Sequence, residues 1–251
     1  MIPGPTKVRG GLPRWVGYLT KPVLLGLACL SLYLWVSGLE LDSIEQRELN
    51  AETITQYFID HLKLTALATL AVVVLAVSAG VLLTRPFARR VSPILVNVAN
   101  IGQGVPSIGV LVLLAIFFGL GFFTAVVALI AYAFLPVLRN TMVGLQQVDR
   151  SVIESARGMG MSKTAVLFRI ELPLAVPIML AGIRTALVIT VGTATLATFV
   201  GAGGLGALIE TGIALQRTPV LVTGAVLTSV LALFIDWLAG VAEDILRPRG
   251  L

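Results

Sequence analysis

The chain has 251 residues, of which 57% are hydrophobic and only 12% are charged, and its formal net charge at pH 7 is +5. A soluble domain carries roughly 25% charged residues, so this chain has too few to cover the surface of a soluble globule. Its mean hydropathy of +0.97 is typical of a protein embedded in lipid, and an ordinary soluble fold is excluded.

Apolar segments predict about six membrane-spanning helices, because a bilayer core of about 30 Å takes roughly 20 helical residues. In chain order, the expected elements are residues 22–37; 62–84; a helix from Pro93 that breaks near 102–106 and continues as a span to Leu120; 122–138 after a turn at 119–121; 174–200; and 220–240. The sequence therefore predicts a cytoplasmic N-terminal segment over residues 1–21 and a single transmembrane domain over residues 22–251.

Basic residues gather on one side of this arrangement. On that side lie Lys7, Arg9, Arg14, Lys21, Arg85, Arg89, Arg90, Arg139, Arg150, Arg157, Lys163, Arg169, Arg247 and Arg249. The opposite side has Arg47, Lys63 and Arg217, with an acidic first loop of Glu40, Asp42, Glu45, Glu48, Glu52 and Asp60. Positive residues favour the cytoplasmic side of a membrane, so both termini are expected in the cytoplasm. This bias explains the net positive charge without a nucleic-acid partner.

The first apolar run also fits a signal peptide, since a basic stretch precedes it and Val36-Ser37-Gly38 could be cleaved. We favour retention, because removal would leave an odd number of spans and put the N-terminus outside. Trp15, Trp35 and Trp237 lie near predicted span ends and are expected to anchor helices at the interfaces.

The chain has one cysteine, Cys29, and one histidine, His61. A structural zinc site needs about four ligands, so no Cys/His metal site is expected, and no disulfide can form within the chain. Cys29 is expected to be a small packing residue. His61 is expected to be a solvated interfacial side chain rather than a proton relay.

The connection between the fourth and fifth spans, residues 146–173, is polar, long and patterned. It predicts a helix, a glycine turn and a second helix. The residues that mark these elements are Asp149 or Ser151 as first cap, Gly158 and Gly160 at the turn, Ser162 as second cap and Pro173 as the stop. Such a unit can dock into a groove of a soluble partner. The same pattern also fits an interfacial loop without a partner.

This segment resembles the EAA loop of ABC importer permeases, in which Glu-Ala-Ala is followed at fixed spacings by Gly, Ile and Leu-Pro. The matching residues are Glu154-Ser155-Ala156, Gly160, Ile170 and Leu172-Pro173, and Ser155 in place of Ala is the one departure. The resemblance implies an all-α, polytopic membrane protein of the type I ABC importer permease fold, with about six transmembrane helices and a cytoplasmic coupling-helix loop.

The resemblance further implies that this loop docks into a cleft of a cytoplasmic ABC ATPase dimer. The implied coupling residues are Glu154, Ser155, Ala156, Gly158, Gly160 and Met161. ATP and Mg²⁺ would be bound by the partner, in agreement with a sequence that contains no Gly-x-x-x-x-Gly-Lys-Ser/Thr phosphate loop. The chain itself is expected to hold no cofactor or metal and to be no enzyme.

Several segments resemble the permeases of importers for osmoprotectants such as glycine betaine, choline or carnitine. They are GQGVPSIGVL (102–111), LPVLRNTMVGL (135–145), ESARGMGM (154–161), AGIRTALV (181–188) and GTATLATFVGAGGLG (192–206). The resemblance implies an importer permease of the bacterial plasma (inner) membrane, acting with an identical or paralogous second permease and an extracytoplasmic substrate-binding protein. The alternatives are a permease for an amino acid such as methionine, or a secondary transporter.

Polar residues in the last two spans have two possible uses. The hydroxyls of Thr185, Thr190, Thr193, Thr195 and Thr198 could line a translocation path, or they could bond back to their own helix. Small residues such as Gly182 and Gly192 permit close packing at the centre of a permease dimer. Intramembrane charges are normally paired, so our hypothesis is that Arg184 and Asp236, each roughly 10–15 Å deep, pair and brace the two spans.

Overall fold

The structure is a computed structural model that describes residues 14–88 and 90–246, with the backbone alone for residues 14–17. Every regular element in these ranges is a helix, and they contain no β-strand. Some residues used in the predictions lie outside the described residues or have no described side chain: Lys7, Arg9, Arg14, Trp15, Arg89, Arg247 and Arg249.

Five helices are long and apolar enough to cross a membrane, and a bent pair of helices brings the number to six. The five are α1 (Arg14–Ser37), α3 (Ala51–Leu83), α6 (Phe122–Gln146), α9 (Leu172–Ala194) and α11 (Thr218–Leu246). The bent pair is α4 (Ser92–Gln103) and α5 (Ser107–Phe118), which meet at 102°. The predicted all-α, polytopic fold is confirmed.

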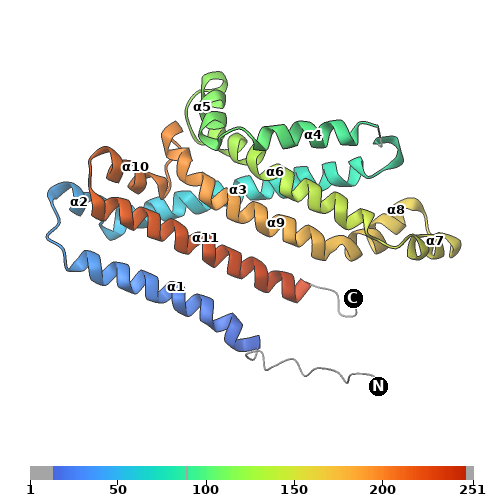
Figure 1. Cartoon of the computed structure of the whole chain (residues 1–251), viewed down its shortest axis with the longest axis horizontal. Helices are drawn as coiled ribbons and strands as arrows, with labels where there is room; N and C mark the ends of the chain where they lie inside the picture. Colours follow the sequence, from blue (N-terminus) through green and yellow to red (C-terminus); the bar gives the residue numbers. More distant parts are fainter. Residues whose placement is uncertain (1–13, 89, 247–251) are drawn as a thin grey trace, which may run out of the picture.

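Shorter helices connect the long ones. They are α2 (Ser43–Glu48), the 3₁₀ helices η1 (Pro86–Ala88) and η3 (Thr195–Val200), α7 (Arg150–Gly158), α8 (Lys163–Val166), the π-helical η2 (Leu167–Glu171) and α10 (Gly206–Ala214). In Figure 1, α1 begins and α11 ends on the side of the bundle toward α7, and α2 and α10 lie at the opposite end. The sequence did not predict α2 or α10.

Several helices differ in length from the predicted spans: α1, α3, α6 and α11 are longer, whereas α9 ends at Ala194 and the chain continues as the 3₁₀ helix η3 to Val200. The α3 helix begins at Ala51 instead of residue 62, since the side chain of Asn50 accepts a hydrogen bond from the Thr53 N–H at 2.8 Å and caps the helix. The α1 helix begins at Arg14 and contains Pro22, where the span was expected to start. The predicted non-membrane segment up to residue 21 is therefore partly helical.

Two prolines inside spans leave carbonyl groups without helical partners, and side chains of neighbouring helices bond to them. Proline has no N–H, so the carbonyl four residues before it is free. Trp237 Nε1 donates to the carbonyl of Tyr18, four residues before Pro22, at 3.0 Å. Gln103 Nε2 donates to the carbonyl of Tyr132, four residues before Pro136, at 2.6 Å. Both prolines thus create contacts between helices.

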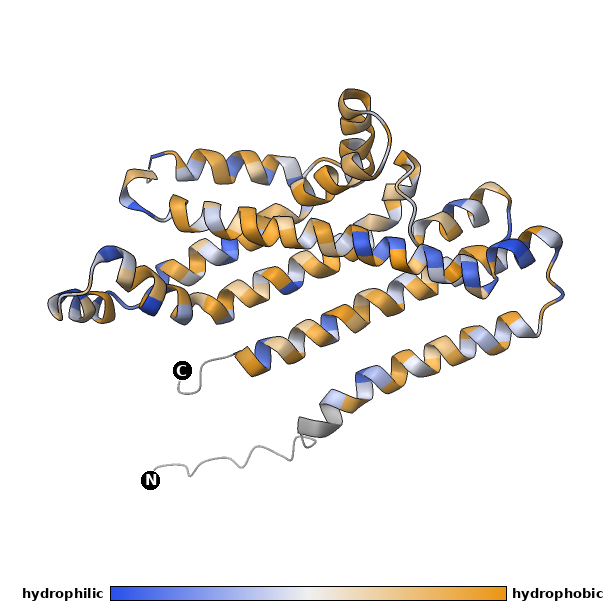
Figure 2. Ribbon diagram, turned by 180° about the vertical axis from the view of Figure 1, so that it is seen from behind, coloured by the Kyte–Doolittle hydropathy of each residue, from blue (hydrophilic) through white to orange (hydrophobic). Residues whose placement is uncertain are grey.

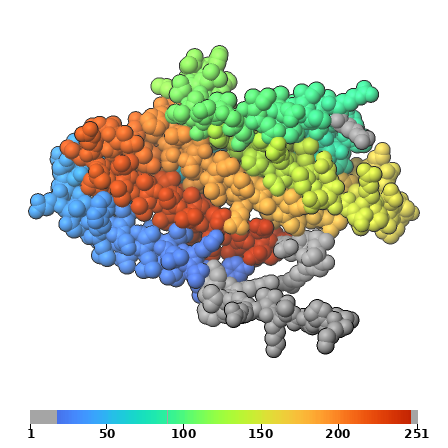
Figure 3. All heavy atoms as spheres, in the orientation of Figure 1, coloured from blue at the N-terminus to red at the C-terminus, as the bar shows by residue number. Residues whose placement is uncertain are grey.

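The corner between α4 and α5 is held from one side by α6. The hydroxyl of Tyr132 donates to the carbonyl of Val105 at 2.9 Å, beside the contact made by Gln103. Residues 104–106 are exposed, and no side chain caps the first N–H groups of α5. The α5 helix rises above the rest of the surface in Figure 3. The predicted break and the turn at 119–121 are both present, with positive φ at Gly119 and Gly121.

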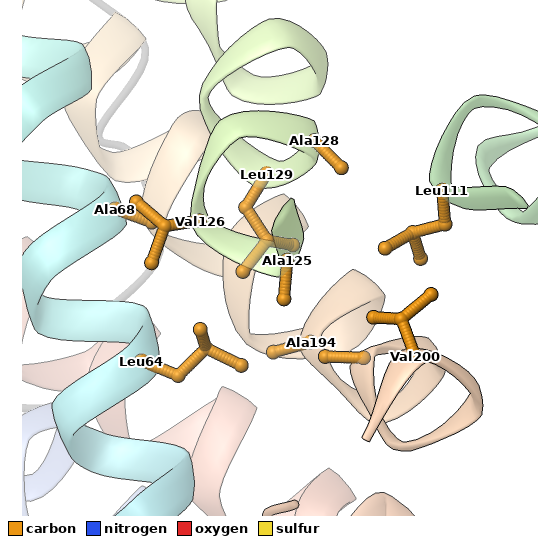
Figure 4. Close-up of a cluster of buried hydrophobic side chains, with 10 residues drawn as sticks. Leu64, Ala68, Leu111, Ala125, Val126, Ala128, Leu129, Ala194 and Val200 are labelled. Atoms are coloured by element: carbon orange, nitrogen blue, oxygen red, sulfur yellow. The ribbon is translucent and has the colours of Figure 1, made fainter. Parts of the chain in front are cut away.

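The centre of the bundle is formed by α3, α6 and α9, and Figure 2 shows mostly hydrophobic residues along these helices. At one end, Leu64, Leu129 and Val200 belong to a buried apolar cluster (Figure 4). Glycine permits the closest approach between α6 and α9: a Cβ on Gly182 would lie 2.5 Å from Cβ of Asn140. Gly192 has nothing within 4 Å of such a Cβ.

His61 is buried, so the expectation of a solvated interfacial side chain is wrong. Its exposed fraction is 0%, and its Nε2 donates to the carbonyl of Val191 at 3.1 Å. The reason is the early start of α3, which places residue 61 about three turns inside the helix instead of at its end. Gly204, at φ +90°, packs against the ring.

Candidate functional site

The α7 helix begins with the side-chain cap that the sequence predicts. Asp149 accepts a hydrogen bond from the N–H of Ser151 at 2.8 Å, and Ser151 lies inside the helix. This hydrogen bond lowers the pKa of the Asp149 carboxyl below its usual value, because it stabilises the ionised form. The cap is therefore ionised and intact at neutral pH.

A glycine turn ends α7 and starts α8. Gly160 has φ +89°, a left-handed conformation that glycine adopts without strain. The N–H of Met161 donates to the carbonyl of Ala156 at 3.2 Å, which closes the turn. Ser162 then caps α8 by accepting from the N–H of Ala165 at 3.2 Å. The predicted helix–turn–helix is present.

Pro173 does not stop the second helix, contrary to expectation. The α8 helix passes through the π-helical η2 directly into α9, where Pro173 lies in the first turn. Because Pro173 has no N–H, the carbonyl of Arg169 loses its α-helical partner. A π turn, in which each N–H donates to the carbonyl five residues earlier, accommodates this missing hydrogen bond. The N–H of Leu172 donates to the carbonyl of Leu167 in this way. The loop thus joins the fifth span through a widened turn.

The predicted coupling residues separate into an inner and an outer set. Ala156 is 1% exposed and packs inward. Glu154, Ser155, Gly158 and Gly160 are exposed, and Met161 is half-buried. Large apolar side chains are exposed beside them, with Met159 at 78% and Phe168 at 63%. The outer face of the loop thus combines one carboxylate, small residues and exposed apolar groups.

An ion pair that the sequence did not predict joins this loop to α3. Arg85 follows the C-cap of α3, and its Nη2 lies 2.7 Å from Oε2 of Glu171, the last residue of η2. In the sequence, Arg85 is one of several basic residues at the end of a span, and Glu171 is a motif position to which no role was assigned. Nothing in their spacing indicates that they form a pair. Their contact becomes visible only when α3 and α9 pack side by side.

Arg184 and Asp236 lie in contact within a larger polar group. Arg184 donates to both carboxylate oxygens of Asp236, from Nε at 2.6 Å and from Nη2 at 2.9 Å. Lys21 Nζ lies 3.2 Å from Asp236, and Nη1 of Arg184 lies 3.5 Å from Glu243. The group connects α1, α9 and α11. Lys21 and Glu243 were missed because nothing in the sequence fixes how α1 packs against α11.

Three of the five threonines of the expected path bond to a carbonyl three or four residues earlier in the chain. The hydroxyls of Thr185, Thr190 and Thr195 donate to the carbonyls of Ala181, Ala186 and Gly192. Thr198 instead donates to Oε2 of Glu210 at 2.8 Å, between η3 and α10. No hydrogen bond is recorded for the Thr193 side chain among the described residues. Among the described residues, these five threonines therefore form no continuous row of free hydroxyls.

The chain matches known membrane transport proteins over most of its length. The family model "binding-protein-dependent transport system inner membrane component" matches residues 72–247. The carnitine transport permease protein OpuCD of Listeria monocytogenes is 38% identical over 82% of this chain and 92% of the relative. The choline transport system permease protein OpuBB of Bacillus subtilis is 38% identical over 76% of this chain and 88% of the relative.

A relative in a third organism extends the match, and a solved structure shares the fold. The osmoprotectant import permease protein OsmY of Salmonella typhimurium is 37% identical over 90% of this chain and 92% of the relative. A structure of the MetNI methionine ABC transporter in an inward-facing conformation is 26% identical, covers 76% of this chain and 95% of its own, and has a TM-score of 0.66.

Proposed function

Because this chain belongs to the family of binding-protein-dependent transport system inner membrane components, we propose that it is the membrane-spanning permease subunit of an ATP-driven importer for osmoprotectants such as glycine betaine, choline or carnitine. One observation carries the substrate class. Relatives 37–38% identical over most of the chain are named as carnitine, choline and osmoprotectant permeases. The MetNI likeness, at 26% identity, supports the fold but favours methionine less.

The other parts of the machine follow from this role. ATP binding and hydrolysis belong to a separate cytoplasmic ATPase dimer, and this chain is a non-catalytic subunit without its own cofactor. A substrate-binding protein on the other side of the bacterial inner membrane delivers the substrate. A second permease subunit, identical or paralogous, completes the path. Both termini and the loop at residues 146–173 face the cytoplasm, in keeping with the distribution of basic residues.

The outer face of α7 is the proposed contact with the ATPase. Glu154 and Ser155 lie exposed on it, and Gly160 lets the chain turn closely there. The exposed side chains of Met159 and Phe168 are suited to a partly apolar groove. ATP then shifts the permease pair from inward-facing to outward-facing by moving this loop.

Uptake in proteoliposomes tests the proposal. The vesicles carry this chain, the ATPase, the binding protein and any second permease, and ATP-dependent uptake of labelled glycine betaine, choline, carnitine and methionine is measured. Glu154→Arg is expected to abolish uptake and ATPase co-purification, because it reverses the charge at the docking face. Glu52→Arg makes the same change on an exposed residue at the far end of the bundle and should leave ATPase co-purification intact.

The outcomes separate the alternatives. ATP-dependent uptake of a quaternary ammonium compound that is lost in Glu154→Arg supports both the importer and the substrate class. Uptake of methionine alone would keep the importer and replace the substrate. Uptake without any ATPase would contradict the importer and favour a secondary transporter.

A further inference from the structure

The contact between Glu171 and Arg85 places a charge pair at the exit of the loop formed by α7, α8 and η2. The side chain of Glu171 is 11% exposed and that of Arg85 is 26% exposed, with Nη2 and Oε2 at 2.7 Å. Carboxylates this well buried are costly unless they are paired and hydrogen-bonded. The two side chains therefore hold each other in place.

Arg85 is fixed to α3 as well as to Glu171. Its Nε donates to the carbonyl of Val81 at 3.2 Å, and Nη2 donates to the hydroxyl of Thr84 at 3.2 Å. A cation also interacts favourably with the free carbonyls at a helix C-terminus. The guanidinium thus moves with the end of α3 and not as a free side chain.

Apolar residues of the same helices also pack together. Val81 of α3, Leu167 of η2 and Leu172 of α9 pack against a small buried cluster of Leu145, Ala175 and Met179. Apolar contacts are non-directional, so helices can slide along them. A charged hydrogen bond with a fixed donor is directional and sets the position of η2 along α3.

The ion pair links the loop to a helix that is not its neighbour in the sequence. The loop follows α6 directly and leads directly into α9, whereas α3 is separated from it by η1, α4, α5 and α6. We infer that the Arg85–Glu171 ion pair is the contact through which the loop moves α3 together with α9 when the ATPase binds ATP. The inference rests on the proposed function, and both residues are positioning residues that touch no substrate.

The widened turn at η2 makes such a contact necessary. A π-helical turn interrupts the regular ladder between α8 and α9 and often marks a functional site. Without a lateral contact, a displacement of α8 could be absorbed within this turn. With Glu171 attached to Arg85, the end of the turn is tied to a second span.

Hydrogen exchange on the assembled complex tests the inference without a transported substrate. The permease–ATPase complex in nanodiscs is compared with and without a non-hydrolysable ATP analogue, and exchange is followed at the end of α3, around residues 78–88. In the wild type, the analogue is expected to change this exchange. In Glu171→Gln and in Arg85→Gln, the response of α3 should fall about fivefold or more, while that of α9 persists.

Three further variants complete the design. The charge swap Arg85→Glu with Glu171→Arg should restore at least part of the α3 response, which no purely local structural defect explains. Arg85→Lys keeps the charge and is expected to fold even where Glu171→Gln does not, with a reduced α3 response because lysine lacks the guanidinium fork. Asp42→Asn breaks the 2.8 Å pair with Arg217 at the opposite end of the bundle and should leave the response unchanged.

The readouts distinguish failure of this inference from failure of the proposed function. Protection of residues 150–160 by the ATPase reports docking of α7. The inference is overturned if α7 is protected in Glu171→Gln and the α3 response equals that of the wild type. Arg85→Lys takes the place of Glu171→Gln if it is the only variant that folds. Either result leaves the importer intact. No protection of α7 in the wild-type complex contradicts the proposed docking and the inference with it.

Discussion

Asp236 is the residue on which the polar group between α1, α9 and α11 converges. It accepts two hydrogen bonds from Arg184 and lies 3.2 Å from Lys21. Replacing it by asparagine removes the charge that both cations face and leaves Arg184 with Glu243 alone. We expect Asp236→Asn to lower the free energy of unfolding by about 2 kcal/mol, with little change in substrate selectivity.

Thermal unfolding in detergent and substrate competition in vesicles check this prediction. Ser229→Ala is the matched control on α11, because its hydroxyl only donates to the Ala225 carbonyl of its own helix. It should unfold like the wild type. A stable, fully active Asp236→Asn protein would show that the pair does not brace the spans.

Gly182 and Gly192 lie on the same helix, and alanine is expected to affect stability differently at the two positions. A Cβ at position 182 would lie 2.9 Å from the carbonyl oxygen of Pro136 as well as against Asn140. Gly182→Ala should therefore destabilise the protein by about 1–3 kcal/mol through overpacking. A Cβ at Gly192 would have no neighbour within 4 Å among the described residues outside its own helix backbone, so Gly192→Ala should leave the stability of the isolated subunit unchanged.

Melting temperatures of the two variants test this difference. Equal stability of the two would mean that α6 and α9 separate more easily than their packing indicates. A Gly192→Ala variant that is stable alone but assembles poorly with the second permease would place Gly192 at the interface between subunits.

At the scale of elements, prolines set how the spans contact each other. Pro136 frees the Tyr132 carbonyl, and Gln103 at the end of α4 occupies it. The corner between α4 and α5 is thus positioned by a proline on a different helix. The same arrangement recurs where Pro22 frees the Tyr18 carbonyl for Trp237.

A double-mutant cycle tests the role of Pro136. Gln103→Ala should cost about 1–2 kcal/mol of stability in the native background, because it leaves the Tyr132 carbonyl unsatisfied. In a Pro136→Ala background the new N–H bonds that carbonyl, so the same change should cost about 1 kcal/mol less. Chemical or thermal unfolding of the four proteins gives the coupling energy. Additive effects would show that Gln103 contributes by packing alone.

Which elements the sequence could predict depends on what encodes them. Long apolar runs, the caps Asp149 and Ser162 and the turn at Gly160 are local signals, and the structure has all of them. Helix α10 and the burial of His61 depend on packing between distant segments, which a single sequence does not show. The continuation through Pro173 was missed because a π turn cannot be distinguished from a helix end by residue type.

At the scale of the whole molecule, the arrangement of helices predicts the topology. The start of α1 and the end of α11 lie on the side of the bundle toward α7, and α2 lies at the opposite end (Figure 1). In a Cys29→Ala background, Ser43→Cys should react with a membrane-impermeant maleimide in intact cells. Ser151→Cys should react only after permeabilisation. Both serines are exposed. The reverse pattern would invert the proposed orientation.

The corner between α4 and α5 has a consequence for a copy of the chain that has no partner subunits. Residues 104–106 are exposed, and the first N–H groups of α5 have no side-chain cap. Backbone groups of this kind are not tolerated against lipid, so another protein surface or water must cover them. A copy without partner chains therefore needs water at this corner, whereas in an assembled permease another subunit can cover it.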